Sequence, residues 1–403
     1  MKKAFYPLLI VLLAAATSCV YPFELEQEAT RELLVIDGDI VPGSSSEITL
    51  SYVSPLTNDL SAPVRRPLTA VVRLEVDRAK SEGGSLYYEV TEPTRREQHG
   101  TVYTVRLTDP ALFSPSDPGA HRYRLAVENG DNGHTYVSEW MQFDKAGMQI
   151  RDVYSRLTDG ESTLSILMDF RANGGYYRIS YKEDWHYTAM YPTNCTYIVP
   201  PVSYGRPVGN GQISMVPLGR YECWNHAESY LLSLVENESH SEKDVDGYLI
   251  KKIRRSDTRL NQDYRIDVQI TSISPDAYLY YQHLKEVTEF DGSLFSPNPS
   301  EMRGNIRCVE DPDELVIGFV DLVRVAKQRR LFSRAELPIY VEPKHYFDTE
   351  PVPVPPTQWY TYYKQGYLPY YYDPDTNSTL WADKRCLDCT ISGGTTVRPE
   401  DWY

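Results

Sequence analysis

The sequence predicts a mainly β protein made of two tandem β-sandwich domains of the immunoglobulin or fibronectin type, the second with one helical insertion and long loops. Short segments of strand-like composition recur along the chain, and turn residues separate them. The length of 403 residues favours two domains over one. A hydrophobic content of 41% provides enough apolar side chains for a core, which excludes a wholly disordered chain.

The N-terminus has the pattern of a lipoprotein export signal. A positive start precedes an apolar run over residues 8–16, and small side chains lead from this run to Cys19. As a helix the run is about 14 Å long, less than half of the roughly 30 Å hydrocarbon core of a bilayer, so it is too short to span a membrane. We therefore expect a signal peptide at 1–18 and acylation of Cys19. The alternative is an ordinary secretory signal in which the cysteine is incidental.

Lipid on Cys19 is the only membrane anchor that the sequence predicts. No other segment approaches a run of about eighteen apolar residues. Several acyl chains hold a protein stably at a membrane, whereas a single chain binds only marginally. Residues 19–30 are acidic and lack a clean period, which indicates a lipidated tether before the first domain.

Residues 31–146 are predicted to form the N-terminal sandwich. Alternate residues of each strand would point inward, toward the facing sheet. The clearest turn is Asn-Gly-Asp-Asn-Gly at 129–133, because Asn and Gly accept the positive φ of hairpin connections. The expected strands cover residues 33–36, 47–53, 70–76, 86–90, 101–107, 123–127 and 135–143.

Residues 147–403 are predicted to form a second β-rich domain with one helix near 275–289. Ser274 can cap this helix, Pro275 suits its first position, and Asp-Gly at 291–292 would end it. Residues 191–222 and the chain from 343 onward have no obvious structure and are expected to be long loops, where binding sites often lie. The expected strands cover residues 153–157, 164–170, 176–181, 230–235, 248–253, 264–270 and 315–325.

The C-terminal region, residues 343–403, has the most unusual composition. A proline-rich spacer at 351–356 precedes eight aromatic residues within fourteen positions. Such rings combine a flat apolar face with a polar tip, which suits stacking on sugars, peptide side chains or a partner protein. The alternatives are rings that pack a loop against the sandwich, or disorder. The candidate binding residues are Trp359, Tyr360, Tyr362, Tyr363, Tyr367, Tyr370, Tyr371 and Tyr372.

No cofactor or metal site is expected. The stretch that begins at Asp373 imitates the start of a calcium loop, but Ser378 stands where the sharp turn needs Gly, and Lys384 stands where a bidentate Glu is required. An Asx turn at Asp373 is the expected structure.

The cysteines allow more than one arrangement. Cys386 and Cys389 could be a redox pair, half of a zinc site or a structural disulfide. Zinc would need two more ligands without a second close pair, and the redox motif belongs in a βαβ unit that the sequence lacks. In an exported protein we therefore expect a Cys386–Cys389 disulfide. Cys195 and Cys223 could form a second bridge and leave Cys308 over, although spacing alone does not decide connectivity.

Several function classes are disfavoured. A net charge of -15 without a dense basic patch would repel nucleic acids and other polyanions. The chain has no His-Glu-x-x-His, no Gly-x-Ser-x-Gly and no phosphate-binding glycine loop, so we expect no enzyme. The pair Glu183-Asp184 is expected at a solvated strand end. Catalytic carboxylates on a β scaffold need no local motif, which keeps an extracytoplasmic hydrolase as a lesser alternative.

Several short motifs occur in order along nearly the whole mature chain, among them Leu-Leu-Val-Ile-Asp-Gly-Asp-Ile at 33–40, Ile-Ser-Pro-Asp-Ala-Tyr at 273–278, Gly-Ser-Leu-Phe-Ser-Pro-Asn-Pro at 292–299, Gly-Asn-Ile at 304–306, Gly-Phe at 318–319, Cys-Leu-Asp-Cys at 386–389 and Pro-Glu-Asp-Trp at 399–402. Together they resemble a Bacteroidota outer-membrane lipoprotein family known as domain of unknown function 4249.

The resemblance implies a lipid-anchored protein of the outer membrane, at the cell surface, of a kind associated with TonB-dependent transporters in nutrient uptake. It supplies no catalytic residues. We therefore expect a non-enzymatic binding or accessory subunit with a glycan or peptide ligand, and a surface adhesin or envelope assembly component is the alternative. The segment 344–380 is longer than the family pattern requires, which suggests a specificity element of this member.

Overall fold

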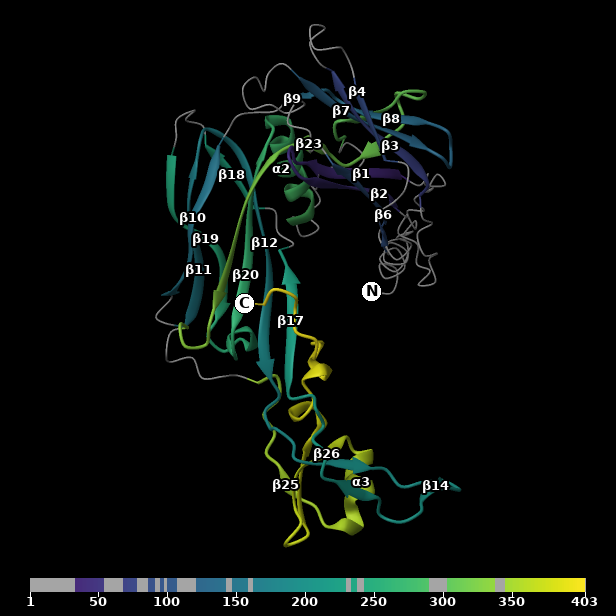
Figure 1. Cartoon of the computed structure of the whole chain (residues 1–403), viewed down its shortest axis with the longest axis vertical. Helices are drawn as coiled ribbons and strands as arrows, with labels where there is room; N and C mark the ends of the chain where they lie inside the picture. The colour runs from purple at the N-terminus through teal and green to yellow at the C-terminus, as the bar shows by residue number, and fades with distance from the viewer. Residues whose placement is uncertain are drawn as a thin grey trace, which may run out of the picture.

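As predicted, the fold is mainly β. The computed structural model has two sandwiches, a helix between them and a small C-terminal lobe (Figure 1). The predicted signal peptide, the tether and Cys19 lie outside the described residues. The structure describes residues 33–53, 68–77, 86–90, 95–97, 100–106, 121–142, 147–158, 162–229, 233–237, 243–289, 303–337 and 345–402.

The first sandwich packs two mostly antiparallel sheets face to face. Ile36 and Ile48 of one sheet and Val72 and Leu125 of the other are fully or almost fully buried in a single apolar core. The turn predicted at 129–133 is confirmed, with Gly133 at a φ of 72°. One sheet contains β1 (Leu33–Ile40), β2 (Ser45–Val53), β5 (Arg95–Glu97) and β6 (Gly100–Arg106), and the other β3 (Ala70–Asp77), β4 (Leu86–Val90), β7 (Arg122–Asn129), β8 (Thr135–Ser138) and β9 (Met141–Gln142).

A late part of the chain completes this sandwich. β21 (Ile306–Cys308) pairs with β8, and both β22 (Val316–Ile317) and β23 (Val320–Leu322) pair in parallel with β1. We call residues 303–323 the return segment. The predicted second domain, 147–403, contained these residues, and one strand was expected over 315–325. Strand pairing instead places the return segment in the first sandwich, because β1 offers an open edge that no local pattern reveals.

Two glycines let the return segment approach β1. Gly318 has a φ of 107°, which favours glycine, and a Cβ there would lie 2.1 Å from the carbonyl oxygen of Ile36. A Cβ on Gly304 would lie 1.6 Å from the carbonyl oxygen of Gly318. Both contacts are to backbone atoms, which cannot rotate away as a side chain can. The return segment therefore requires glycine at both positions.

Most strands of the second sandwich overlap predicted ones, but the strand at Glu222–Glu228 and most of the strand at Arg324–Phe332 were not predicted. Phe170 of one sheet and Tyr177 and Ile266 of the other are buried together in its core. One sheet contains β10 (Met148–Thr158), β11 (Thr163–Ala172) and β19 (Lys243–Arg254), and the other β12 (Gly175–Thr188), β17 (Glu222–Glu228), β18 (Ser233–Asn237), β20 (Tyr264–Ile273) and β24 (Arg324–Phe332).

Glu183 lies inside this second sandwich, contrary to the expectation of a solvated strand end. Its side chain is 1% exposed and pairs with Lys251 and Arg259. The hydroxyl of Tyr264 also donates to Glu183 at 2.7 Å. Since a buried carboxylate needs cations and hydrogen-bond donors around it, this arrangement accounts for Glu183 as a paired structural charge.

Helix α2 (Pro275–Glu289) is confirmed at its predicted position and lies at the junction of the two sandwiches. The Ala277 amide donates to the Ser274 hydroxyl at 3.2 Å, which is the expected cap. Tyr280 and Tyr281 of the helix pack on Phe319 of the return segment. Beside them, Arg178 of β12 forms an ion pair with Asp39 of β1. The helix and this ion pair thus connect the two sandwiches.

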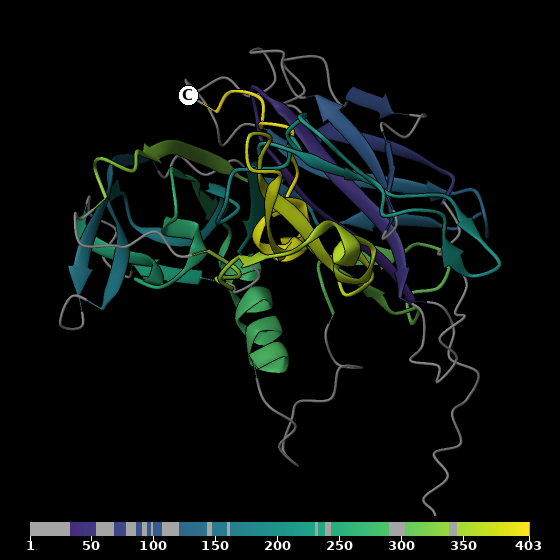
Figure 2. The same ribbon diagram turned by 90° about the horizontal axis from the view of Figure 1, so that it is seen from below.

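Two segments predicted as long loops fold together into a C-terminal lobe. Residues 191–222 and 345–392 meet below the second sandwich, at the end of the molecule opposite the first sandwich, whereas Thr395 pairs with Trp224 of β17 and the C-terminus runs back along this sandwich (Figure 1). Seen from below, the lobe lies in front of the two sandwiches (Figure 2). Its elements are β13 (Thr196–Ile198), β14 (Val202–Ser203), β15 (Arg206–Pro207), β16 (Gln212–Ser214), β25 (Val352–Pro353), α3 (Trp359–Lys364), β26 (Tyr367–Asp373) and β27 (Ser378–Asp383).

Substitution of Gly304 tests the close approach of the return segment. We expect Gly304→Ala to lower the free energy of unfolding by about 3 kcal/mol, because the added methyl group meets fixed backbone. The measurement is urea unfolding. The control is Gly133→Ala, whose Cβ would meet open space, so that only the strain of a positive φ remains, about 1 kcal/mol. Equal losses in the two variants would contradict the steric explanation.

Candidate functional site

The lobe is built around an aromatic core. Trp359 and Trp381 are buried, and the Trp359 indole N–H lies 3.0 Å from the Thr379 hydroxyl oxygen and 3.2 Å from the Val354 carbonyl oxygen. Tyr197, from the other segment of the lobe, packs edge-on against Trp381 with ring centroids 5.3 Å apart. These ring contacts hold two segments together that are more than 150 residues apart in the chain.

The predicted binding rings are distributed between this core and the lobe surface. Trp359 is 7% exposed, so packing accounts for it. Tyr371 is 45% exposed and keeps the largest open fraction of the eight. Tyr370 leans against Tyr191 at 5.0 Å between ring centroids. The half-buried members of the set are Tyr360, Tyr362, Tyr363, Tyr367, Tyr370 and Tyr372.

A hairpin of β14 and β15 extends from the lobe and exposes apolar side chains (Figure 1). Tyr204 and Gly205 at its tip have positive φ, as a tight hairpin turn requires, and the Tyr204 side chain is fully open to solvent. Monomeric proteins rarely gather exposed apolar residues without a function. We call this set the hairpin surface; it comprises Ile198, Val199, Val202, Tyr204, Val208, Met215 and Val216.

The sequence indicated 191–222 as a long loop in which a site could lie, but none of the residues of the hairpin surface was predicted. The signal was present in Ile-Val-Pro-Pro-Val-Ser-Tyr-Gly-Arg-Pro-Val at 198–208, where apolar residues alternate with turn residues in a segment without a longer strand pattern. The same sequence pattern would suit a small buried core. The residues are known to be exposed only because, in the described part of the structure, no other element packs over them.

The disulfide differs from the predicted one. Cys389 is bonded to Cys223 of β17, with 5.8 Å between their Cα atoms, and Cys386 is a buried free thiol. Cys386 and Cys389 lie in separate short 3-10 turns. The Cys389 amide donates to the carbonyl of Arg220 at 3.0 Å, which places its side chain against β17. Cys195 and Cys308 are also buried free thiols.

The Asx turn predicted at Asp373 is confirmed. The Asp375 amide donates to the Asp373 side chain at 2.9 Å, and the Thr376 hydroxyl donates to its other oxygen at 2.7 Å. Both carboxylate oxygens of Asp373 therefore have partners within the turn, which accounts for the calcium-like sequence.

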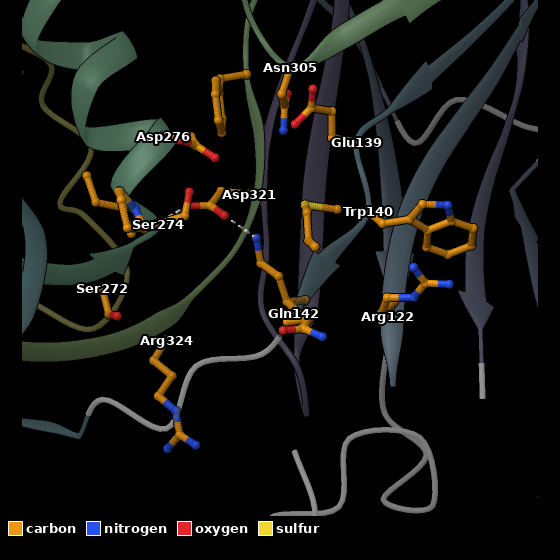
Figure 3. A pocket seen from close by; sticks show the side chains of 15 residues that line it. Arg122, Glu139, Trp140, Gln142, Ser272, Ser274, Asp276, Asn305, Asp321 and Arg324 are labelled. Carbon is orange, nitrogen blue, oxygen red and sulfur yellow. Dashed lines mark hydrogen bonds between the residues drawn. The ribbon is translucent and has the colours of Figure 1, made fainter. Parts of the chain in front are cut away.

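A pocket of about 430 Å³ lies at the junction of the sandwiches (Figure 3). Trp140, between β8 and β9, forms one side. The residue is 36% exposed, and its ring centroid lies 4.6 Å from the Arg124 guanidinium and 5.3 Å from the Arg122 guanidinium. Ser274 and Asp276, at the start of α2, form the opposite side. A pocket lined by carboxylates, amides and hydroxyl groups, with an aromatic ring at its rim, suits a polar ligand.

Asp321 of β23 is the buried charge of this pocket. Its side chain accepts the Ser274 amide at 2.7 Å and the Leu322 amide at 2.9 Å, and the residue is 3% exposed. Burial raises the pKa of Asp321 to about 6, although the two amides act in the opposite direction. Because both oxygens hold backbone amides, the carboxylate positions the start of α2 relative to the first sandwich.

In the part of the chain that the structure describes, every helix falls short of the length and apolarity needed to cross a membrane.

A family model described as domain of unknown function (DUF4249) matches residues 20–329. The match covers the first sandwich, α2, the hairpin surface, the return segment and the second sandwich as far as residue 329 in β24. It ends before the aromatic region, so the motifs at 386–389 and 399–402 lie beyond it. No curated protein matches the chain.

Peptide mapping tests the disulfide. We expect a non-reducing digest to contain a linked peptide pair with Cys223 and Cys389, and we expect the Cys386→Ser variant to keep this linkage. Reduction should lower the free energy of unfolding by about 2–4 kcal/mol, because the bridge closes a long loop. Detection of a Cys386–Cys389 bridge in the native protein would contradict the structure.

The raised pKa of Asp321 predicts a specific pH dependence. The ordinary pKa of an aspartate side chain, which applies in the unfolded chain, is 3.8, whereas the pKa of Asp321 in the folded protein is about 6. Protonation of Asp321 therefore stabilises the folded state fully below pH 3.8, and this stabilisation is lost as the pH rises through about 6. Between about pH 4 and pH 7 wild type should lose about 2 kcal/mol relative to Asp321→Asn, which does not titrate. Urea unfolding of both proteins at each pH gives the difference. A difference that is constant with pH would refute the assignment.

Proposed function

The chain belongs to the family described as domain of unknown function (DUF4249), and on its structure we propose that it is a non-enzymatic binding or accessory subunit of a TonB-dependent nutrient-uptake system. In this proposal it is attached to the outer membrane, at the cell surface, by lipid on Cys19. The export signal predicted at residues 1–18 supports this location.

The hairpin surface is the observation that carries this proposal. Val202 is 52% exposed, Val208 is 60% exposed and Tyr204 projects entirely into solvent. They lie on the hairpin that projects from the lobe, at the end of the molecule opposite the first sandwich (Figure 1). An exposed aromatic side chain surrounded by aliphatic ones has the composition of an interface anchor. A membrane-embedded transporter with an apolar extracellular or periplasmic face is the partner that we assign to it.

The pocket at the junction supports the binding part of the proposal. Asn305, Gln142 and Glu139 contribute amide and carboxylate groups to its lining, and Trp140 lies at its rim beside Arg122 (Figure 3). Sugar rings and peptide side chains both combine an apolar face with hydrogen-bonding edges. A glycan or a peptide is therefore the ligand class that we propose for this pocket.

Two observations bear on the alternatives. An assembly component that accepts a donated strand needs an unpaired sheet edge, and the β1 edge is already paired with the return segment of the same chain. A hydrolase would use the carboxylates near the pocket, and Asp321 has the raised pKa of a general acid. However, both Asp321 oxygens accept backbone amides, so a role in positioning α2 is favoured.

Co-purification tests the proposed function. After mild detergent extraction of cells that express the tagged wild-type protein, we expect a barrel-type transporter to be recovered with it. The double variant Val202→Asp, Tyr204→Asp should reduce this recovery at least tenfold, because it places charges in the apolar contact.

The matched control is Val397→Asp, which places a charge at another exposed apolar position of the tail, 71% exposed. It should leave recovery at the wild-type level. Wild-type protein recovered without a barrel, or equal recovery with the double variant, would count against the proposal.

A further inference from the structure

A cluster of metal-ligating side chains lies where the return segment meets the first sandwich, away from the pocket and the lobe. His134 precedes β8, Cys308 ends β21, and Glu314 lies in the loop that follows. The pairing of Cys308 with Tyr136 between β21 and β8 brings these three residues together, although 174 positions separate His134 from Cys308. One ligand atom from each residue lies within 4.8 Å of the other two.

From this geometry we propose that His134, Cys308 and Glu314 bind a zinc ion. The His134 Nδ1 lies 3.5 Å from the Cys308 Sγ and 2.9 Å from the Glu314 Oε2. In a tetrahedral site with ordinary zinc bond lengths these separations would be about 3.6 Å and about 3.3 Å. The cluster therefore needs only a slight opening between the histidine and the glutamate to hold the ion.

The donor set selects the metal class. A thiolate, an imidazole and a carboxylate form a mixed sulfur, nitrogen and oxygen set, which suits Zn²⁺ and disfavours Ca²⁺ or Mg²⁺, since these prefer oxygen ligands alone. Glu310 has its Oε2 3.7 Å from the Cys308 Sγ, but this oxygen already accepts the Thr135 amide at 2.7 Å, so a water would supply the fourth position. On binding, the Cys308 thiol loses its proton to solvent and the sulfur forms the bond to the metal.

Neighbouring groups already orient these ligands. The Tyr136 hydroxyl donates to the second oxygen of Glu314 at 2.7 Å and leaves Oε2 directed at the histidine. The Asp311 amide points at the Cys308 sulfur from 3.4 Å, as amides do around metal-bound thiolates. Cys308 is fully buried, whereas His134 and Glu314 keep 35% and 25% of their side chains exposed, so an ion can reach the site from solvent.

The ion would link the return segment to the first sandwich. The return segment joins the first sandwich through three short strands, β21, β22 and β23, and a metal bond from β21 and its loop to the residue before β8 would hold it there. Cys223–Cys389 does the same for the C-terminal lobe on the second sandwich. The proposed site goes beyond the proposed function and does not depend on it.

Cobalt binding tests the site, because Co²⁺ replaces Zn²⁺ in such sites and reports on its ligands. The full detergent-solubilised protein is reduced, treated with chelator and titrated with Co²⁺ alone. We expect one equivalent to bind, with the near-ultraviolet absorption of a cobalt–thiolate bond, and Zn²⁺ to displace it. Zn²⁺ should also raise the unfolding temperature of the wild-type protein.

The variants identify the ligands. Cys308→Ser should abolish the thiolate absorption, and Glu314→Gln, which can still accept from Tyr136, should weaken Zn²⁺ binding at least tenfold. Cys195→Ser is the matched control, since Cys195 is an equally buried free thiol outside the cluster, and it should bind as wild type does.

The opposite results would show that the cluster is only an ion pair with a hydrogen-bonded thiol. One such result is that the reduced wild-type protein fails to bind one equivalent of Co²⁺. The other is that the thiolate absorption persists in the Cys308→Ser variant. If Cys308→Ser fails to fold, Glu314→Gln and His134→Gln decide the question, because full affinity for Zn²⁺ in both would overturn the site.

Discussion

The parallel pairing of β1 with β22 and β23 is the contact on which the rest of the architecture depends. It requires the backbone of Gly318 to pass closer to β1 than any side chain would permit, and Gly304 in turn to pass equally close to Gly318. Only Val323 separates β23 in the first sandwich from β24 in the second. The position of the return segment therefore determines how the two sandwiches meet, and with it the shape of the pocket between them.

Buried charges reinforce this junction. Asp321 holds the first turn of α2 through the Ser274 amide, and Arg178 reaches across from the second sandwich to Asp39. Removing charges from water is costly, and partners offset the cost only in one arrangement of the elements. These contacts consequently favour a single relative placement of the sandwiches. A rigid junction of this kind suits a protein that holds a ligand pocket and a distant contact surface in a fixed relation.

The clustered aromatic residues of the lobe were expected to form a binding surface, but many of them pack in its interior. Trp359 and Trp381 form a small core with Tyr197, so much of the tyrosine-rich segment serves to fold the lobe. The exposed apolar residues lie on the other segment, in the hairpin around Tyr204. A small lobe has little apolar area to bury, and the Cys223–Cys389 bridge supplies a covalent connection to the second sandwich.

Local patterns in the sequence determined most strands of both sandwiches, the position of α2, the cap at Ser274 and the Asx turn at Asp373. Each of these follows from periodicity or from hydrogen bonds between near neighbours. Tertiary structure alone decided the return of residues 303–323 to β1, the Cys223–Cys389 bridge and the meeting of His134 with Cys308. In these cases residues more than 150 positions apart come together, and which distant edge or side chain pairs with which depends on the packed fold as a whole.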